Sequence, residues 1–251
     1  CFENIAYKYE KNFLKIDIFS LDKKKDIFIL RNCLGNIKFI TEKIPHKDWI
    51  KNQKQQDKGS QTNLFFFHQG FSEKETTKRQ ILLPVGQSFG SGTHESTILA
   101  IKLIEKLLKK KKIKFPLDLG TGSGILSFIL NIHLKKKIFA TDICEHSINE
   151  FKLNSKRNNI KNLFFIKSFG MNNIYLKRKK FDLVVANLLM NEHKSILFCV
   201  CRQIQKKGFL IISGILVNQK NFFIILLDKL NFKLLDSLTD NNWCCLIFKK
   251  N

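Results

Sequence analysis

The stretch Leu-Asp-Leu-Gly-Thr-Gly-Ser-Gly-Ile-Leu at residues 117–126 constrains the fold of this chain more than any other feature. It predicts a buried strand, a glycine-rich turn and the start of a helix, in that order. Because glycine has no Cβ, the backbone of the turn can pass close to a ligand. The helix that follows directs free N–H groups and a partial positive charge at the same place. A dinucleotide, a phosphate or S-adenosylmethionine could bind such a turn.

Strands and helices alternate from this region to the C-terminus. The expected strands are at residues 115–119, 137–141, 163–166, 181–186, 209–212 and 243–248. The expected helices are at residues 97–108, 125–134, 146–158, from just after 187 to about 205, and 219–230. The strands are apolar on both faces, which indicates a parallel sheet that helices cover on each side. The sequence therefore predicts an α/β doubly wound fold for residues 84–251.

The N-terminal part has a different pattern. Between residues 13 and 44 the apolar runs are short, and Leu14, Ile16 and Ile18 alternate with polar residues. Residues 48–57 are polar and rich in Gln and Lys. We expect a small α+β domain at residues 1–57. A linking hairpin at 58–83 would follow, with strands at 65–67 and 81–84.

Composition limits the classes of function. The formal net charge of +23 suggests a nucleic-acid partner, but the excess is almost all lysine. Arginine is better suited than lysine to form paired hydrogen bonds with phosphates and base edges, which weakens that interpretation. The basic runs at 109–112, 135–137 and 177–180 fall between apolar segments, so the sequence favours solvated turns over a binding surface. No apolar run approaches the roughly 18 residues of a membrane span, and we expect no signal peptide.

The seven cysteines have no spacing typical of a zinc site or a disulfide framework. We therefore expect reduced, buried cysteines, no metal and a cytoplasmic protein.

Three polar side chains stand at the ends of expected strands. Asp118 directly precedes the glycines, Asp142 closes the next strand, and Asn187 closes the fourth. An acid at the position of Asp142 is suited to the diol of a ribose. The turn lacks the Gly-x-Gly-x-x-Gly spacing that suits a pyrophosphate, and Asp118 would repel one. The combination favours S-adenosylmethionine, whose charged amino end Asp118 can support. Asn187 can accept a hydrogen bond from an incoming amine and orient it.

Each of these residues also has a purely structural interpretation. Asp118 could be a turn acid, Asp142 a helix cap and Asn187 a turn former. Residues 84–97 form a loop rich in glycine and hydroxyl groups that leads into a helix. It could cover a ligand or cap the helix through Thr93. His94 in this loop could act as a base, although capping or packing is favoured. His193 is expected to be a surface or helix histidine.

The loop at 84–97, the Asp-x-Gly-x-Gly-x-Gly turn and the Ala-Asn-Leu-Leu strand end at 186–189 resemble the methyltransferases of ribosomal large-subunit protein 11, the PrmA family. The most specific parts are Phe-Gly-Ser-Gly-Thr-His at 89–94, and Ser-Gly-Ile-Leu at 213–216. The resemblance implies a Rossmann-like class I methyltransferase with a seven-stranded, mostly parallel sheet. It implies S-adenosylmethionine as cofactor. The residues implied or expected at the cofactor are Thr97, Gly120, Asp142 and Asn187, with Phe89, Thr93, Asp118 and Gly122.

The resemblance also implies a substrate and a setting. Family members methylate the α-amino group and lysine ε-amino groups of the ribosomal protein, which implies a bacterial cytoplasmic enzyme. We expect a monomer that requires neither nucleic acid nor a membrane. A small ferredoxin-like domain grips the substrate in the family, and residues 1–57 are short for all of it. Other departures are mild: Ser91 replaces a threonine, and Glu95-Ser96 replaces Pro-Thr.

Two other functions compete with this one. The first is a class I methyltransferase that acts on RNA or on a glutamine side chain. Such enzymes resemble one another in an Asn/Asp-Pro-Pro-aromatic strand end, and Asn-Leu-Leu-Met at 187–190 has neither the prolines nor the aromatic residue. The second is a non-catalytic RNA- or ribosome-binding relic of the fold. The net charge supports it, and the intact cofactor motifs oppose it.

Overall fold

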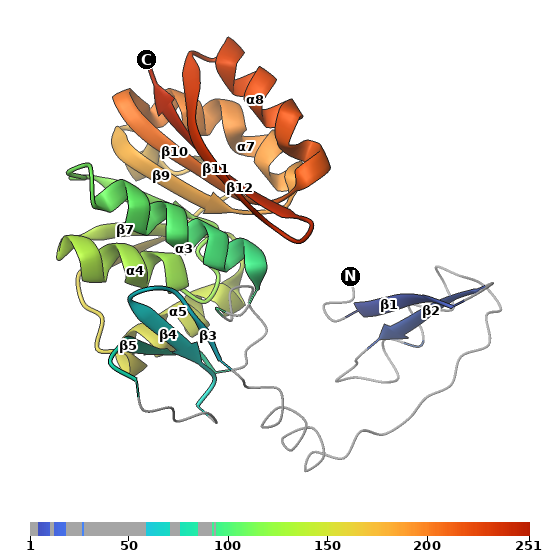
Figure 1. Cartoon of the computed structure of the whole chain (residues 1–251). Helices are drawn as coiled ribbons and strands as arrows, with labels where there is room; N and C mark the ends of the chain where they lie inside the picture. The colour runs from blue at the N-terminus through green and yellow to red at the C-terminus, as the bar shows by residue number, and fades with distance from the viewer. Residues whose placement is uncertain are drawn as a thin grey trace. The chain divides into compact units, whose positions relative to one another are not determined.

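The computed structural model describes residues 5–10, 13–18, 27, 59–70, 76–84, 92 and 94–251. The chain divides into two compact units, residues 1–49 and 50–251 (Figure 1). In the first unit, β1 (Ile5–Glu10) and β2 (Phe13–Ile18) form an antiparallel pair in which Ile5 lies opposite Ile18. Strand β2 contains the alternating residues that predicted a strand. The ferredoxin-like character of residues 1–57 stays a prediction.

The second unit is built on a seven-stranded sheet with the order β11-β12-β10-β9-β6-β7-β8. Its parallel strands are β6 (Pro116–Leu119), β7 (Ile138–Asp142), β8 (Leu163–Lys167), β9 (Phe181–Asn187) and β10 (Ile204–Leu216). Strand β12 (Trp243–Lys250) runs antiparallel to β10, and β11 (Phe232–Asp240) pairs antiparallel with β12 at the sheet edge. The predicted mostly parallel α/β sheet is confirmed.

Helices cover both faces of the sheet. They are α3 (Glu95–Leu108), α4 (Ile125–Leu134), α5 (Glu145–Arg157), the short α6 (Ile174–Lys177), α7 (Met190–Gln203) and α8 (Lys220–Lys229), which a 3-10 turn at Val217–Gln219 precedes. Successive residues of β9 belong to different cores. Leu183 packs with α3 and α4, whereas Val184 packs with α7 and α8. This alternation explains why the strands have no polar face in the sequence.

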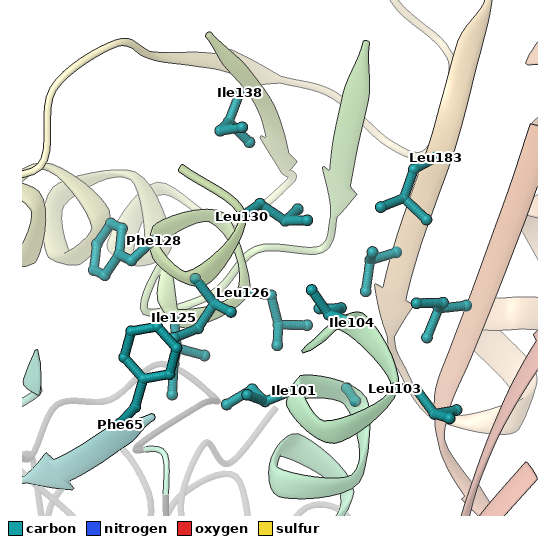
Figure 2. Packing of buried hydrophobic residues seen from close by; sticks show 14 of the residues in the cluster. Phe65, Ile101, Leu103, Ile104, Ile125, Leu126, Phe128, Leu130, Ile138 and Leu183 are labelled. Atoms are coloured by element: carbon teal, nitrogen blue, oxygen red, sulfur yellow. The ribbon is translucent and has the colours of Figure 1, made fainter. Parts of the chain in front are cut away.

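Figure 2 shows the core on the side of α3 and α4, where Ile104, Leu126 and Leu130 gather beside Leu183 of the sheet. Phe65 joins this core from a second sheet of three strands, β3 (Ser60–Gln61), β4 (Phe65–His68) and β5 (Arg79–Leu82). Strands β3 and β4 pair antiparallel, and β5 joins β4 in parallel. Burial of each such apolar side chain stabilises the unit by about 1.5–3 kcal/mol.

Two expectations drawn from composition can be compared with the described residues. Within these ranges, no helix has the length and the apolar character that crossing a membrane demands. The described cysteines are free, but the prediction that they are buried is wrong for Cys144 and Cys199, which are exposed. Cys201, Cys244 and Cys245 are buried as predicted, because they belong to a helix and a strand that face the cores.

Candidate active site

The glycine turn lies where β6 ends and α4 begins, at the carboxyl edge of the parallel strands. Gly120 has φ +71° and its N–H donates to the carbonyl oxygen of Thr141 at 2.9 Å. A Cβ at Gly120 would lie 2.4 Å from Cδ2 of Leu188, in the segment that follows β9. Only glycine combines this left-handed backbone with so close an approach. The turn and the end of β9 are therefore held in direct contact.

A cavity of about 310 Å³ opens at this edge of the sheet, at the lower end of the range of ligand sites in proteins. Its walls come from the carboxyl ends of β6, β7, β9 and β10, the segments after β6, β7, β8 and β9, the first turn of α3 and the first residue of β12. The residues that line it include Gly120, Gly122, Asp142, Ile143, Phe169, Asn187, Leu188, Glu192, Gly214 and Trp243. Open α/β sheets bind ligands at this edge of their strands.

Asp142 is fixed at the mouth of the cavity. Its Oδ2 accepts a hydrogen bond from the N–H of Gly122 at 2.9 Å, and its Oδ1 accepts one from the N–H of Cys144 at 2.9 Å. Each carboxylate oxygen can accept a further hydrogen bond. Asp142 and Gly122, both predicted as cofactor-binding residues, thus lie together on the cavity wall.

Asp118 lies beneath the cavity and is fully buried. Its Oδ2 accepts hydrogen bonds from the hydroxyl of Thr121 at 2.6 Å, and from the N–H and hydroxyl of Ser127 at 2.9 and 2.7 Å. Among the described residues, its Oδ1 has no hydrogen-bond partner. Burial raises the pKa of this carboxyl to about 6, against the lowering effect of those hydrogen bonds. Asp118 therefore ties the glycine turn to α4, and its predicted role at a ligand amino group stays a prediction.

Asn187 presents an unpaired acceptor at the cavity. Its Nδ2 donates to Oγ1 of Thr97 at 3.2 Å, while its buried Oδ1 has no hydrogen-bond partner in the described part of the chain. Thr97 is fully buried in the first turn of α3 and reaches the cavity through Asn187, rather than lining it. Two of the predicted site residues, far apart in sequence, are thus in direct contact. A buried acceptor without a partner is costly unless a ligand satisfies it.

The end of β9 is supported from behind by Ser213, Gly214 and His193. The N–H of Leu188 donates to the carbonyl of Ser213 at 3.1 Å, and Nε2 of His193 lies 2.8 Å from the same oxygen. Gly214 has φ +78°, and a Cβ there would lie 2.5 Å from the carbonyl oxygen of Leu188. His193 was expected to be a surface or helix histidine, and it lies on helix α7 but not on the surface. It is 1% exposed, and burial lowers its pKa to about 4.

The loop that precedes α3 is described in part, and Phe89 and Thr93 lie outside the described residues. Gly92 accepts a hydrogen bond from the hydroxyl of Ser60, which attaches the loop to the small sheet. His94 is the N-cap of α3, because its Nδ1 accepts from the N–H of Ser96. Its ring also packs edge-on against Trp243 at 4.7 Å. Capping and packing, the favoured roles of His94, are confirmed.

Sequence reasoning missed the apolar walls of the cavity. Ile143 is 60% exposed and Phe169 is 52% exposed, and both belong to segments that directly follow a strand, whereas Gly214 lies near the end of β10. The signal available was position, since the residues after each parallel strand converge at one edge. Trp243 gave no such signal, because β12 is antiparallel and reaches the cavity with its first residue.

The residues present fit S-adenosylmethionine. Ile143, Phe169 and Trp243 provide apolar surface for a base, and Asp142 provides a fixed acceptor for a diol. The acidic side chains of Asp142 and Glu192 suit a cationic ligand. The described residues contain no group of three or more His, Cys, Asp or Glu side chains that could hold a metal ion.

Comparisons with known proteins agree with this geometry. The profile of the family "Ribosomal protein L11 methyltransferase (PrmA)" matches residues 9–251. A protein of that name from Prochlorococcus marinus (strain MIT 9215) is 36% identical over 71% of this chain and 58% of its own length. One from Campylobacter fetus is 31% identical over 80% of this chain and 71% of its own length. The chain thus spans less than two thirds of the first of these relatives.

Among solved structures, a ribosomal protein L11 methylase from Lactobacillus delbrueckii subsp. bulgaricus superimposes with a TM-score of 0.68 and 25% identity. The match covers 76% of this chain and 97% of that one. A precorrin-6y C5,15-methyltransferase from Geobacter metallireducens, at 14% identity and a TM-score of 0.53, shares the fold alone. The Rossmann-like sheet is therefore common to methyltransferases of different substrates, and the choice of substrate depends on the site.

Proposed function

Because this chain belongs to the ribosomal protein L11 methyltransferase (PrmA) family, we propose that it transfers methyl groups from S-adenosylmethionine to amino groups of ribosomal protein L11. The acceptors are the terminal α-amine and lysine ε-amines. The observation that carries the proposal is the buried, unpaired Oδ1 of Asn187 at the cavity. An acceptor in this position is satisfied by an N–H group, and the substrate amine supplies one.

The chain's own residues bind the two reactants and align them. Asp142 accepts hydrogen bonds from the ribose diol, and the backbone at Gly120 and Gly122 passes close to the nucleoside. S-adenosylmethionine, when bound, supplies a methyl group that its positive sulfur has already activated. The task of the protein is then mainly proximity and orientation, which can contribute about 7–11 kcal/mol.

The amine must be neutral to attack, and Asn187 is suited to orient it. Its Oδ1 accepts one N–H of the amine and so sets the direction of the nitrogen lone pair. Thr97 in turn fixes the amide of Asn187 through a hydrogen bond. An α-amine, with a pKa of about 7.7–8.0, needs little help to be neutral, whereas a lysine of about 10.4 needs desolvation. The apolar walls at Leu188 and Trp243 provide that desolvation.

The setting of the enzyme follows from the substrate. A ribosomal protein is made in the cytoplasm, and we place the enzyme there, acting as a monomer on the protein itself without a requirement for nucleic acid. Recognition of the ribosomal protein is assigned to residues 1–57, and methyl transfer to residues 84–251.

The test is methyl transfer by the 251-residue chain to purified ribosomal protein L11, with tritiated S-adenosylmethionine as donor and mass spectrometry as readout. We expect mass increases of whole methyl groups on the N-terminal peptide and on lysine peptides. Ribosomal RNA incubated in parallel should gain no label. Label on RNA alone would favour the RNA methyltransferase alternative, and donor binding without any transfer would favour a non-catalytic relic.

A further inference from the structure

The lysine runs of this chain lie together at one edge of the seven-stranded sheet. The runs at 135–137 and 177–180 directly precede β7 and β9, and the run at 109–112 lies three residues before β6. Parallel strands begin at the same edge, so these three runs meet opposite the cavity. The sequence could not show this, because it separates the runs by two helices and their strands.

Two further pairs of lysines join them. Residues 206–207 are exposed and lie where the register of β10 against β9 shifts, between Ile204 and Phe209. Residues 249–250 end the antiparallel β12, and Lys249 pairs with Phe209. The C-terminus in Figure 1 therefore marks this edge. We call these five segments the basic edge: 109–112, 135–137, 177–180, 206–207 and 249–250. They extend across the neighbouring strands β12, β10, β9, β6 and β7, which span about 20 Å at the usual strand spacing.

The charge of the basic edge is not neutralised by described carboxylates. In the part of the chain that the structure describes, lysine–carboxylate pairs are Lys106 with Asp236 and Lys167 with Glu145, and none of these lysines belongs to the basic edge. Lys180 and Lys250 donate instead to backbone carbonyls. The carboxylate of Asp182, beside the start of β9, accepts from backbone N–H groups of residues 114 and 115.

Acidic side chains lie at the opposite edge. Asp142 and Glu192 line the cavity, and the exposed Asp240 ends β11 opposite Trp243 of β12. Lys167 ends β8 at this edge as well, but it pairs with Glu145. The basic edge, whose lysines have no described carboxylate partner, lies away from the site where a cationic amine must enter.

Aromatic rings are exposed between the lysines. Phe115 is 55% exposed and Phe164 is 37% exposed, and Nζ of Lys137 lies 4.3 Å from the ring centroid of Phe164. Basic residues interleaved with aromatic rings suit a nucleic acid, because lysines contact phosphates while rings stack on bases. A membrane-binding surface would instead need an amphipathic helix with a broad apolar face. Lysine contacts a phosphate as a point charge, so the contacts of the basic edge with RNA would not depend on the RNA sequence.

We propose that the basic edge docks the phosphate backbone of RNA while the cavity at the other edge remains open. The choice of RNA rests in part on the proposed function, since a ribosomal protein assembles with ribosomal RNA. Docking is not required for methyl transfer to the free protein. It retains the enzyme near RNA with its cavity directed outward.

The test compares two triple variants with the same net charge. The first, Lys111→Gln, Lys137→Gln and Lys206→Gln, removes charge from the basic edge. The second, Lys102→Gln, Lys152→Gln and Lys194→Gln, removes exposed charges from α3, α5 and α7. Binding of a fluorescein-labelled RNA hairpin of about 30 nucleotides is measured by anisotropy, between about 50 and 200 mM salt. Circular dichroism and methyl transfer are recorded for each protein.

We expect the first triple variant to bind the hairpin at least tenfold more weakly than the original chain, and the second to stay within twofold. The slope of log K against log salt should fall in magnitude by about 2–3 in the first variant alone. Equal losses in both variants, or tighter binding to anionic phospholipid vesicles than to the hairpin, would overturn the proposal. Methyl transfer should be the same in all three proteins; its absence in all three would refute the proposed function and leave the RNA result intact.

Discussion

Thr97 and Asn187 are ninety positions apart in the sequence, yet the amide of Asn187 donates to the hydroxyl of Thr97 at 3.2 Å. This hydrogen bond joins the first turn of α3 to the end of β9 and fixes the amide of Asn187, a residue of the cavity wall. Its buried Oδ1 is left without a hydrogen-bond partner among the described residues, and Thr97 does not itself line the cavity. Thr97 is accordingly a positioning residue for Asn187.

The Thr97→Val variant should lower kcat for methyl transfer about 5–50-fold, because the amide loses its partner and is free to rotate. Thr97→Ser keeps the hydroxyl and should restore most of the rate. KM for the protein substrate should change little in either variant. Steady-state kinetics on L11 test this, and a Thr97→Val enzyme with unchanged kcat would show that the hydrogen bond plays no part in orienting the amine.

Asp142→Ala should weaken the binding of S-adenosylmethionine more than tenfold, since both carboxylate oxygens are lost together with their support of Gly122 and Cys144. Isothermal titration calorimetry measures the affinity. Asp240→Ala removes an exposed acid from the same edge and serves as the control. An unchanged affinity in Asp142→Ala would remove this carboxylate from the site.

Gly120→Ala should weaken cofactor binding at least tenfold, because the new Cβ would lie 2.4 Å from Cδ2 of Leu188 and would displace this side chain of the cavity wall. The left-handed backbone adds about 1–2 kcal/mol of strain. Gly70→Ala is the control. Gly70 has φ +100°, so the alanine is similarly strained, but it lies in the segment after β4 and not on the cavity wall. If both variants retain the original affinity, the turn does not need glycine to accommodate the ligand.

Burial of His193 predicts a dependence of stability on pH. Its pKa is about 4 when folded, below its usual 6.5, so the unfolded chain binds the extra proton between these values. The contribution of His193 is present above pH 6.5 and is lost as the pH falls toward 4, by about 1.4 kcal/mol per pH unit. Urea unfolding of the original chain and of His193→Gln should diverge in this window, with the variant less sensitive to acid. Parallel curves would contradict the burial of a neutral imidazole.

Burial of Asp118 should make the stability of the fold depend on pH in the opposite direction. Its pKa is raised by burial from 3.8 to about 6, so the folded chain holds a proton that the unfolded chain has released. The stability it contributes is present below pH 3.8 and is lost as the pH rises through 6. Compared with Asp118→Asn, the original chain should therefore lose stability between pH 4 and 6, which the same urea series measures. A gain over that range would mean that the carboxylate is ionised when folded.

Periodicity and strand-end residues predicted most of the second unit. Helix α4 was predicted with its observed bounds, because Gly124 precedes it and apolar residues recur at helical spacing. Strand β11 was missed, because Phe232–Asp240 mixes charged and apolar residues at a sheet edge, where one strand face meets solvent. Helix α6 was missed because a single turn, Ile174–Lys177, leaves no period to detect.

The site was predicted as far as local signals extend. Gly120, Gly122, Asp142 and Asn187 were identified from motifs, and all four line one cavity. The roles of Asp118 and Thr97 depend on which atoms are already paired, and the sequence carries no such information. The burial of His193 was missed for the same reason, since its position on α7 says nothing about Ser213 beneath it.

Trp243, the first residue of the last strand, has a consequence for synthesis of the protein. One wall of the cavity is absent until the ribosome has delivered β12, which also separates β10 from the edge strand β11. A nascent chain that has emerged only as far as β10 has every glycine of the turn but lacks this indole. The cavity is therefore complete only once β12 has joined the sheet, long after its glycine turn has been synthesised.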